Sequence, residues 1–513
     1  MKKLNIVGII ALVFLLSSCS SMDMSSEPYY DKSTLYQTIG STEGEGYNEI
    51  IENHYFNTSS FSVSTFGVDV DTASYSNIRR LLEDEIIPTS NAVRIEEMVN
   101  YFNYDLIEPG VDEEIGITTE IGTAPWNEDH KLLMVGLKTE AIDFADTPGN
   151  NLVFLLDVSG SMNNNDKLPL LKEAIKMLVN QLRPEDRISI VVYAGAAGLV
   201  LDGADGSDTD TIIAAIDSLS AGGSTAGGAG INLAYSVAMD HFIEGGNNRV
   251  ILGTDGDFNV GVSTNSGLEA LIEEKRESGV FLSVCGFGTG NLQDGKMETL
   301  ADKGNGVYHY IDSLLEAKKV FVDELGGSLI TVAKDVKLQI EFNPLTVKGY
   351  RLIGYENRLL DYQDFDNDQI DSGDMGAGHE VIAFYEIIPA SSDEEVNEDE
   401  YEQPEELKYD GTNFSDEIMT LSIRYKDPES DTSELIEEVV YVTSYTDTPS
   451  NSFMFASAVV EFGLILRDSE YKGTSSFQTV IDSATLYQGA DEKGYRQEFI
   501  TLVQTAKHLI EKD

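Results

Sequence analysis

The chain has 513 residues, which is too long for one hydrophobic core and predicts roughly two to four domains. Its 34 basic and 89 acidic residues give a formal net charge of −55. Such a surface repels nucleic acids and anionic membranes, which argues against nucleic-acid binding, and it attracts divalent cations to oxygen-lined sites. A strongly solvated surface suited to salty surroundings explains the same charge equally well.

The N-terminus has the layout of an export signal. Lys2 and Lys3 precede an apolar run over residues 6–16, which is too short to span a bilayer. The small residues that follow and end in Cys19 resemble a bacterial lipobox. The resemblance implies a signal peptide over 1–18 and lipidation of Cys19, and hence a location in the cell envelope outside the cytoplasm, at the outer membrane in a Gram-negative cell. A simple membrane anchor is the alternative.

Residues 19–60 are rich in Ser, Glu, Asn, Gly and Tyr and predict a flexible tether. Residues 61–148 form the next predicted region. They begin with a short strand that leads into a helix at about 75–84, followed by a second helical pattern at 92–102. From about 115 to 138 apolar and polar residues alternate, which indicates strands, and Trp126 is expected in a core.

Residues 149–333 show regular alternation of strands and helices. Strands are predicted at about 151–157, 187–194, 248–254, 280–286 and 306–310. Helices are predicted at about 167–182, 208–219, 227–242, 265–277, 293–302 and 313–332. This alternation predicts an α/β domain with a doubly wound, mainly parallel sheet covered by helices on both faces. Cys285 is expected to be buried in the fourth strand without a disulfide partner.

Strand-like segments return over residues 334–448, interrupted by an acidic stretch at 393–406 that indicates a solvated loop. Because strands occur on both sides of the α/β domain, we expect one β-sandwich built from both flanks, with the α/β domain inserted in it. Residues 449–513 have helical spacing and predict a C-terminal helical region.

Short-armed oxygen side chains follow the first strand of the α/β domain, in the segment Asp157-Val158-Ser159-Gly160-Ser161. The carboxyl ends of strands are where ligands bind in open α/β sheets. Carboxylate and hydroxyl oxygens suit Mg²⁺, Mn²⁺ or Ca²⁺ better than zinc. Two later loops can reach the same edge: a glycine-rich loop that contains Thr225, and the end of the strand before Asp255.

These elements resemble the metal-ion-dependent adhesion site of von Willebrand factor type A (vWA) domains, whose pattern is Asp-x-Ser-x-Ser, then Thr, then Asp. The resemblance implies a divalent cation, foremost Mg²⁺, held by the hydroxyls of Ser159, Ser161 and Thr225. Asp157 and Asp255 would act directly or through water. It also implies a protein partner that supplies a carboxylate to the ion. The flanks resemble those of bacterial vWA lipoproteins, which have an N-terminal vWA-associated region and a C-terminal region of unknown function.

Two other functions stay open at this point: an envelope scaffold with a structural metal, and a metal-dependent hydrolase. No Ser or Cys nucleophile with an identifiable base emerges, so we expect no enzymatic activity. The glycine-rich loop lacks the Gly-Lys-Ser/Thr ending of a phosphate-binding loop. Residues 364–368 resemble the start of a calcium loop, but Gln369 and Met375 replace the glycine and glutamate that such a loop needs.

Overall fold

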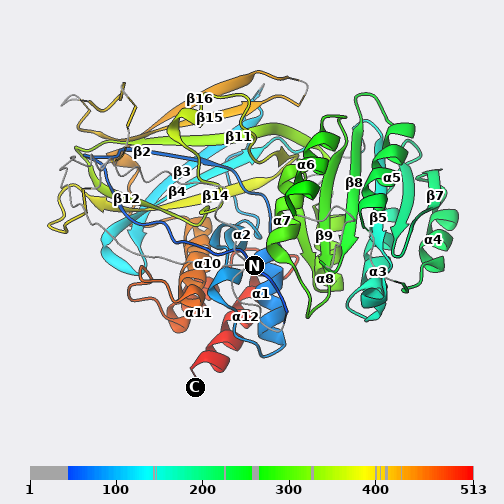
Figure 1. Cartoon of the computed structure of the whole chain (residues 1–513). Helices are drawn as coiled ribbons and strands as arrows, with labels where there is room; N and C mark the ends of the chain where they lie inside the picture. The colour runs from blue at the N-terminus through cyan, green and yellow to red at the C-terminus, as the bar shows by residue number, and fades with distance from the viewer. Residues whose placement is uncertain are drawn as a thin grey trace, which may run out of the picture. The chain divides into compact units, whose positions relative to one another are not determined.

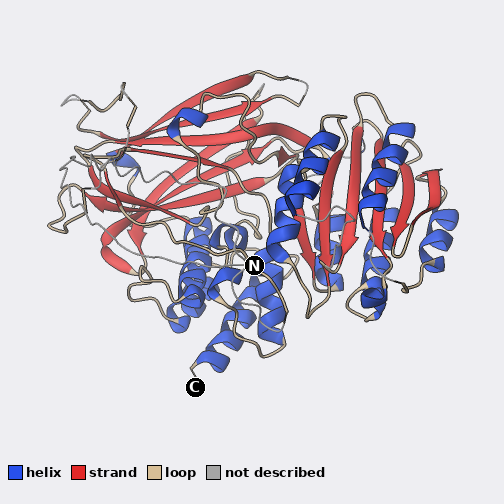
Figure 2. Cartoon of the chain, in the orientation of Figure 1, coloured by secondary structure: helices blue, strands red, loops and turns tan. Residues whose placement is uncertain are grey.

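The computed structural model describes residues 44–511, apart from 112, 143, 144, 146, 224–226, 257–264, 325–328, 399, 400, 402, 405, 411–413 and 429. Cys19 and Thr225 therefore lie outside the described residues. Figure 1 shows the elements in chain order, and Figure 2 separates helices from strands. Among the residues that the structure describes, no helix has the length and apolarity needed to cross a bilayer.

One six-stranded sheet forms the α/β domain, in the order β10-β9-β8-β5-β6-β7. Its strands are β5 (Asn150–Asp157), β6 (Arg187–Tyr193), β7 (Ala197–Asp205), β8 (Asn247–Thr254), β9 (Phe281–Phe287) and β10 (Tyr308–Ile311). All neighbours pair in parallel except β7, which is antiparallel to β6. The predicted doubly wound, mainly parallel sheet is confirmed. The edge strand β7 was not predicted: its short apolar run, Leu199-Val200-Leu201, stays largely exposed at the edge of the sheet.

Helices cover both faces of this sheet (Figure 2). They are α3 (Leu168–Val179), α4 (Thr209–Ser218), α5 (Gly227–Asp240), α6 (Asn265–Arg276), α7 (Asp294–Lys303) and α8 (Leu314–Lys318). Leu152 and Phe154 of β5 pack with α3, α4 and α8, whereas Val153 and Leu155 pack with α5, α6 and α7. A strand buried on both faces is therefore apolar at successive positions. Cys285 of β9 is a free, buried thiol, as expected.

The helix predicted over 313–332 is shorter than expected. α8 ends at Lys318 and is followed directly by one π-helical turn, Lys319–Asp323. Thr331 already begins strand β11, which pairs with strands of the flanking sandwich. After residues 325–328, which lie outside the described residues, Leu329 is helical again, two residues before β11 begins.

Two antiparallel sheets form a sandwich from strands on both sides of the α/β domain, as predicted. One sheet has the order β1-β12-β14-β4-β3, and the other has the order β13-β11-β15-β16 with β2 paired to β11. The strands are β1 (Phe56–Asn57), β2 (Val63–Gly67), β3 (Ile115–Ala124), β4 (Asn127–Thr139), β11 (Thr331–Phe342), β12 (Val347–Ile353), β13 (Met375–Gly376), β14 (Glu380–Pro389), β15 (Glu417–Lys426) and β16 (Ser433–Tyr441). Leu133 and Val135 of β4 share a core with Leu338 and Ile340 of β11.

Helices pack on the outer face of the first sheet. They are α1 (Ala73–Glu83), α2 (Ile95–Val99), α10 (Asn451–Arg467), α11 (Phe477–Leu486) and α12 (Tyr495–Ile510). Leu132 and Met134, which alternate with the sandwich-facing residues of β4, belong to this second core, together with Trp126. Alternate side chains of β4 therefore point to opposite faces of the sheet, one set into the sandwich core and the other set against the helices. The predicted helical C-terminus is confirmed as three helices.

The tether predicted over 19–60 is wrong from residue 45 onward. Tyr47 is only 1% exposed, and the Glu45 carboxylate accepts hydrogen bonds from the buried Arg80 guanidinium at 3.0 and 2.8 Å. Phe56 and Asn57 form β1, which pairs with β12. The polar composition looked unstructured because these residues are buried through ionic and aromatic contacts rather than through an apolar run.

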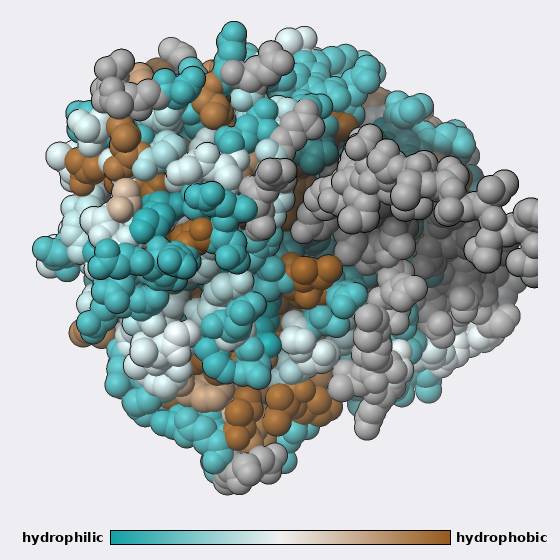
Figure 3. Space-filling model, turned by 60° about the vertical axis from the view of Figure 1, so that its left-hand side comes forward, coloured by the Kyte–Doolittle hydropathy of each residue, from teal (hydrophilic) through white to brown (hydrophobic). Residues whose placement is uncertain are grey.

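Buried ion pairs join the flanks to the α/β domain. Arg79 of α1 pairs with Asp312 and Glu316, and Arg94 pairs with Asp294. Arg358, which follows β12, pairs with Asp302 at 2.8 Å. The face in Figure 3 is mostly hydrophilic, with hydrophobic residues in small separate patches. These three arginines are therefore used inside the fold, in a chain whose composition is dominated by acidic residues.

Candidate metal site

Two strands of the α/β sheet end beside each other in carboxylates. β5 ends at Asp157, and Asp255 directly follows β8, the strand that pairs with β5 in parallel. Both aspartates are fully buried, whereas Gly160 and Ser161 are exposed. The two carboxylates therefore lie beneath a loop that opens to solvent, at the carboxyl edge of the sheet where ligands bind.

The Asp157 side chain, at the end of β5, fixes the loop that follows. Asp157 Oδ1 accepts a hydrogen bond from the Ser159 backbone N–H at 2.7 Å, and the hydroxyls of Ser159 and Ser161 are 2.9 Å apart. Asp157 Oδ2 is buried and has no hydrogen-bond partner among the described residues. A buried, unsatisfied carboxylate oxygen costs free energy unless a proton or a cation satisfies it.

The glycine-rich loop lies against this segment, as the sequence predicts. The Gly222 N–H donates to the Val158 carbonyl at 2.7 Å, and the Gly160 N–H donates to the Gly223 carbonyl at 3.1 Å. Gly223 has φ +89°, a left-handed conformation that glycine adopts without strain. These bonds bring the start of the glycine-rich loop to the acidic loop, while Thr225, two residues farther on, lies outside the described residues.

The electrostatics of the two aspartates differ. Burial raises the pKa of the Asp157 carboxyl from 3.8 to about 6, and the nearby Asp255 charge adds to this rise against the lowering effect of the Ser159 hydrogen bonds. Burial also acts to raise the pKa of Asp255, but the Lys167 ammonium and hydrogen bonding with Ser161 lower it below its usual value. Asp157 is therefore the carboxylate that lacks positive charge beside it.

Lys167 and Asn291 complete the site and were not predicted from the sequence. Lys167 Nζ lies 3.0 Å from Asp255 Oδ2 and donates to Asn291 Oδ1 at 2.8 Å. Tyr193, the last residue of β6, has a buried hydroxyl whose pKa is raised by burial and by the charge of Asp157. The only sequence signal for Tyr193 was its position at the carboxyl end of a predicted strand.

The loop that carries Asn291 is held by the N-terminal flank. The Gly290 N–H donates to Glu45 Oε1 at 3.1 Å, and the Gly46 N–H donates to the Leu292 carbonyl at 2.9 Å. Because Glu45 is itself paired with Arg80 of α1, one side of the site is supported by residues more than 200 positions away in the chain. The site is therefore shared between the α/β domain and its flank.

The described residues fit a hard divalent cation. They supply two carboxylates, two adjacent hydroxyls and one buried carboxylate oxygen without a partner, and oxygen ligands of this kind suit Mg²⁺ and its relatives. Among the described residues, no group of three or more His, Cys, Asp or Glu side chains is placed to hold a metal, at this site or elsewhere, so the hydroxyls of Ser159 and Ser161 are needed beside the two carboxylates. The segment 364–368 instead binds a lysine, because the carbonyls of Asp364 and Asn367 accept from Lys337 Nζ.

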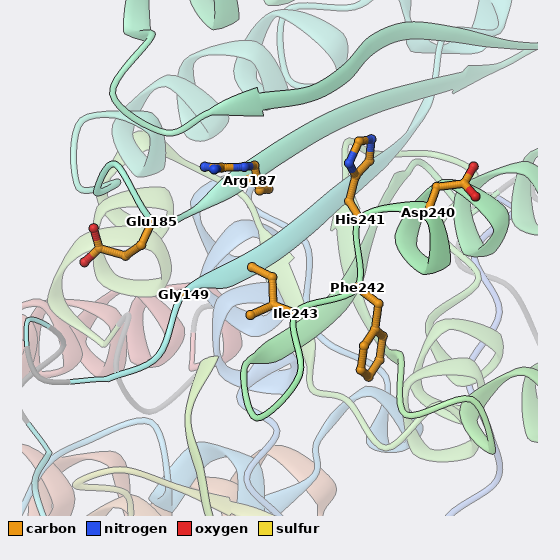
Figure 4. A pocket seen from close by; sticks show the side chains of 7 residues that line it. All are labelled: Gly149, Glu185, Arg187, Asp240, His241, Phe242 and Ile243. Atoms are coloured by element: carbon orange, nitrogen blue, oxygen red, sulfur yellow. The ribbon is translucent and has the colours of Figure 1, made fainter.

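A cavity of about 410 Å³ lies elsewhere in the α/β domain. Figure 4 shows the residues that line it: Gly149, Glu185, Arg187, Asp240, His241, Phe242 and Ile243. Gly149 precedes β5 and Arg187 begins β6, so the cavity is at the amino edge of the strands, opposite Asp157. Its two basic side chains are paired, Arg187 with Asp205 and His241 with Asp202.

Comparison with known proteins identifies the family to which this architecture belongs. The von Willebrand factor type A domain family matches residues 151–322, and a family described as von Willebrand factor matches 41–134. An Escherichia coli K12 protein, "Uncharacterized protein YfbK", is 42% identical over 468 residues, which cover 90% of this chain and 80% of that protein. The chain belongs to the YfbK family. The C-terminal family of YfbK matches residues 327–509, so the β-rich and helical C-terminal parts are those of YfbK proteins as well.

Two solved structures are among those similar to part of this chain. A von Willebrand factor type A protein from Catenulispora acidiphila is 17% identical, with a TM-score of 0.44, and covers 79% of this chain and 91% of that chain. Proximal thread matrix protein 1 from the mussel byssus, with a zinc-occupied MIDAS motif, is 25% identical, with a TM-score of 0.29, and covers 34% of this chain and 45% of that chain. Both TM-scores are below 0.5, so neither likeness bears on the geometry of this site.

Proposed function

We propose that this protein binds a protein partner through a divalent cation held by Asp157, Ser159, Ser161, Thr225 and Asp255. The observation that carries the proposal is the buried, unpartnered Oδ2 of Asp157 beside the paired hydroxyls of Ser159 and Ser161. Mg²⁺ is the cation that the donor set suits best, since it prefers oxygen ligands and keeps some coordination positions for other groups. Such an ion accepts a carboxylate oxygen as a further ligand.

The surface above the carboxylates suits an incoming partner. Gly160, Ser161, Gly222 and Gly223 are exposed or partly exposed, and glycines leave room for an approaching side chain. Ser159 is buried beneath them at 2% exposed. A carboxylate from a partner can therefore reach the site from solvent, while Asp157, Ser159 and Asp255 stay buried beneath it. The role proposed is binding rather than hydrolysis.

The test is partner capture that depends on the cation. The immobilised mature protein is incubated with an extract of its own cell envelope in 5 mM MgCl₂ or 5 mM EDTA, on the order of concentrations that saturate or strip a weak oxygen-lined site. We expect specific partners to be retained in MgCl₂ and lost in EDTA or with Asp157→Asn. Partners that remain equally bound in EDTA would contradict the proposal and favour the alternative, an envelope scaffold whose metal is structural.

We further propose that lipidation of Cys19 anchors the protein in the cell envelope. The support is the sequence alone: an apolar run over 6–16 that ends in small residues before Cys19. Metabolic labelling with a fatty-acid analogue is expected to label the unaltered protein, and Cys19→Ala is expected to lose the label and to leave the membrane fraction. Equal labelling of both proteins would contradict this anchor.

A further inference from the structure

Lys167 places an ammonium group inside the proposed metal site. Its side chain is only 5% exposed, and its ammonium nitrogen lies 3.0 Å from Asp255 Oδ2. A second acceptor, Asn291 Oδ1, lies 2.8 Å away. Lysine is rarely buried unless it is paired, so this ion pair has a specific role in holding the side chain where it is.

The fold makes room for this lysine. Gly288, at φ +78°, lies so close that a Cβ atom there would be 2.3 Å from Lys167 Cγ. Any other residue at 288 would push the lysine stem away from Asp255. Lys167 also immediately precedes α3, and its backbone N–H donates to the Asn164 carbonyl at 3.1 Å. Both ends of the side chain are therefore fixed, by the backbone at one end and by Asp255 and Asn291 at the other.

A cation at this position opposes a second cation. The Lys167 charge stabilises the buried Asp255 carboxylate when no metal is present, and it repels a divalent ion that approaches the same carboxylate. Asp157, in contrast, has a buried oxygen with no partner among the described residues. One carboxylate is thus neutralised within the chain and the other is left for the ion.

We propose that Lys167 is a positioning residue and internal counter-ion of the metal site, which stabilises the metal-free protein and weakens Mg²⁺ binding. This inference rests on the proposed function, because it concerns the same cation. Its consequence is that occupancy of the site follows the external cation concentration: a site with two uncompensated carboxylates would hold its ion more tightly. Asn291 shares the role by fixing the ammonium beside Asp255.

Two variants make the charge of the site more negative by one, by different routes. Lys167→Met removes the ammonium and keeps the length of the stem, and Asn291→Asp adds a carboxylate next to an unaltered lysine. By isothermal titration calorimetry with MgCl₂ on the mature protein, we expect both to bind Mg²⁺ about tenfold more tightly than the unaltered protein. In EDTA, Lys167→Met is expected to have a lower Tm, because Asp255 loses its counter-ion, and a larger gain in Tm on adding Mg²⁺.

Lys172→Met is the matched control. Lys172 lies on α3, and its ammonium donates to the carbonyls of Asp217 and Leu219, so the same substitution there changes the net charge of the protein but not that of the site. We expect its Mg²⁺ affinity to equal that of the unaltered protein. If Lys167→Met and Asn291→Asp bind Mg²⁺ no more tightly than Lys172→Met, the counter-ion role is wrong and the metal site stands. If the unaltered protein binds no Mg²⁺, the proposed function itself fails. Should Lys167→Met not fold, Asn291→Asp decides the question.

Discussion

Asp157→Asn is expected to abolish Mg²⁺ binding while the fold stays intact. Asparagine keeps the oxygen that accepts the Ser159 N–H but removes the negative charge and the free carboxylate oxygen. Loss of supporting groups around protein metals costs roughly 10- to 100-fold in affinity, so loss of a direct ligand is expected to cost at least about 100-fold. The measurement is the rise in Tm with increasing MgCl₂, which should vanish in the variant.

In EDTA the same variant is expected to be at least as stable as the unaltered protein. The Asp157 carboxylate is buried and its pKa is raised to about 6, so the ionised form is disfavoured in the folded state. Removing its charge therefore removes a cost at neutral pH. Asp240→Asn, at the opposite edge of the sheet, is the control and should keep the full response to MgCl₂ (Figure 4). An unchanged Mg²⁺ response in Asp157→Asn would contradict the role assigned to Asp157.

Arg79→Met is expected to lower the free energy of unfolding by about 3–5 kcal/mol, because it leaves two buried carboxylates without their counter-ion. Arg79 Nη2 lies 2.8 Å from Glu316 Oε2, and the two side chains are 3% and 1% exposed. Asp312, a second partner, is 4% exposed, and Glu498, a third partner at 3.4 Å, is 21% exposed. This cluster joins α1 of the flank to the segment at α8 of the α/β domain, so the loss should weaken the attachment between them.

Arg187→Met provides the comparison. Arg187 is 38% exposed and pairs with the exposed Asp205 at 3.3 Å, and surface pairs of this kind contribute about 0–1 kcal/mol. Denaturant unfolding of both variants measures the difference. Equal losses for Arg79→Met and Arg187→Met would show that the buried cluster does not hold the flank to the α/β domain.

Local pattern was sufficient to predict the α/β domain. Each core strand has an apolar run buried on both faces, and the acidic loop follows the strand directly, so periodicity and position identified both β5 and the Asp157 segment. The antiparallel edge strand β7 was not predicted, because its apolar run of three residues, Leu199 to Leu201, is shorter than those of the core strands and is followed directly by Asp202. The early end of α8 could not be predicted, because Val320 and Phe321 continue its apolar spacing into the π-helical turn.

What the sequence could not reveal depends on long-range partners. Lys167 looks like a solvated residue at a helix start, and only the fold brings it to Asp255, 88 positions later. Glu45 belongs to a segment of polar composition, and its burial depends on Arg80 and on the distant Gly290. Charged residues are usually predicted from the sequence to be exposed, and this prediction fails for buried ion pairs.

The central claim is that a divalent cation binds at Asp157, Ser159 and Ser161. Anomalous diffraction from crystals of the mature protein grown with MnCl₂ tests it most directly, because Mn²⁺ replaces Mg²⁺ at oxygen-lined sites and its position can be located independently of the protein model. We predict an anomalous peak in contact with the hydroxyls of Ser159 and Ser161 and beside Asp157, and none in crystals of Asp157→Asn. Crystals of the unaltered protein with no peak at these residues would contradict the account.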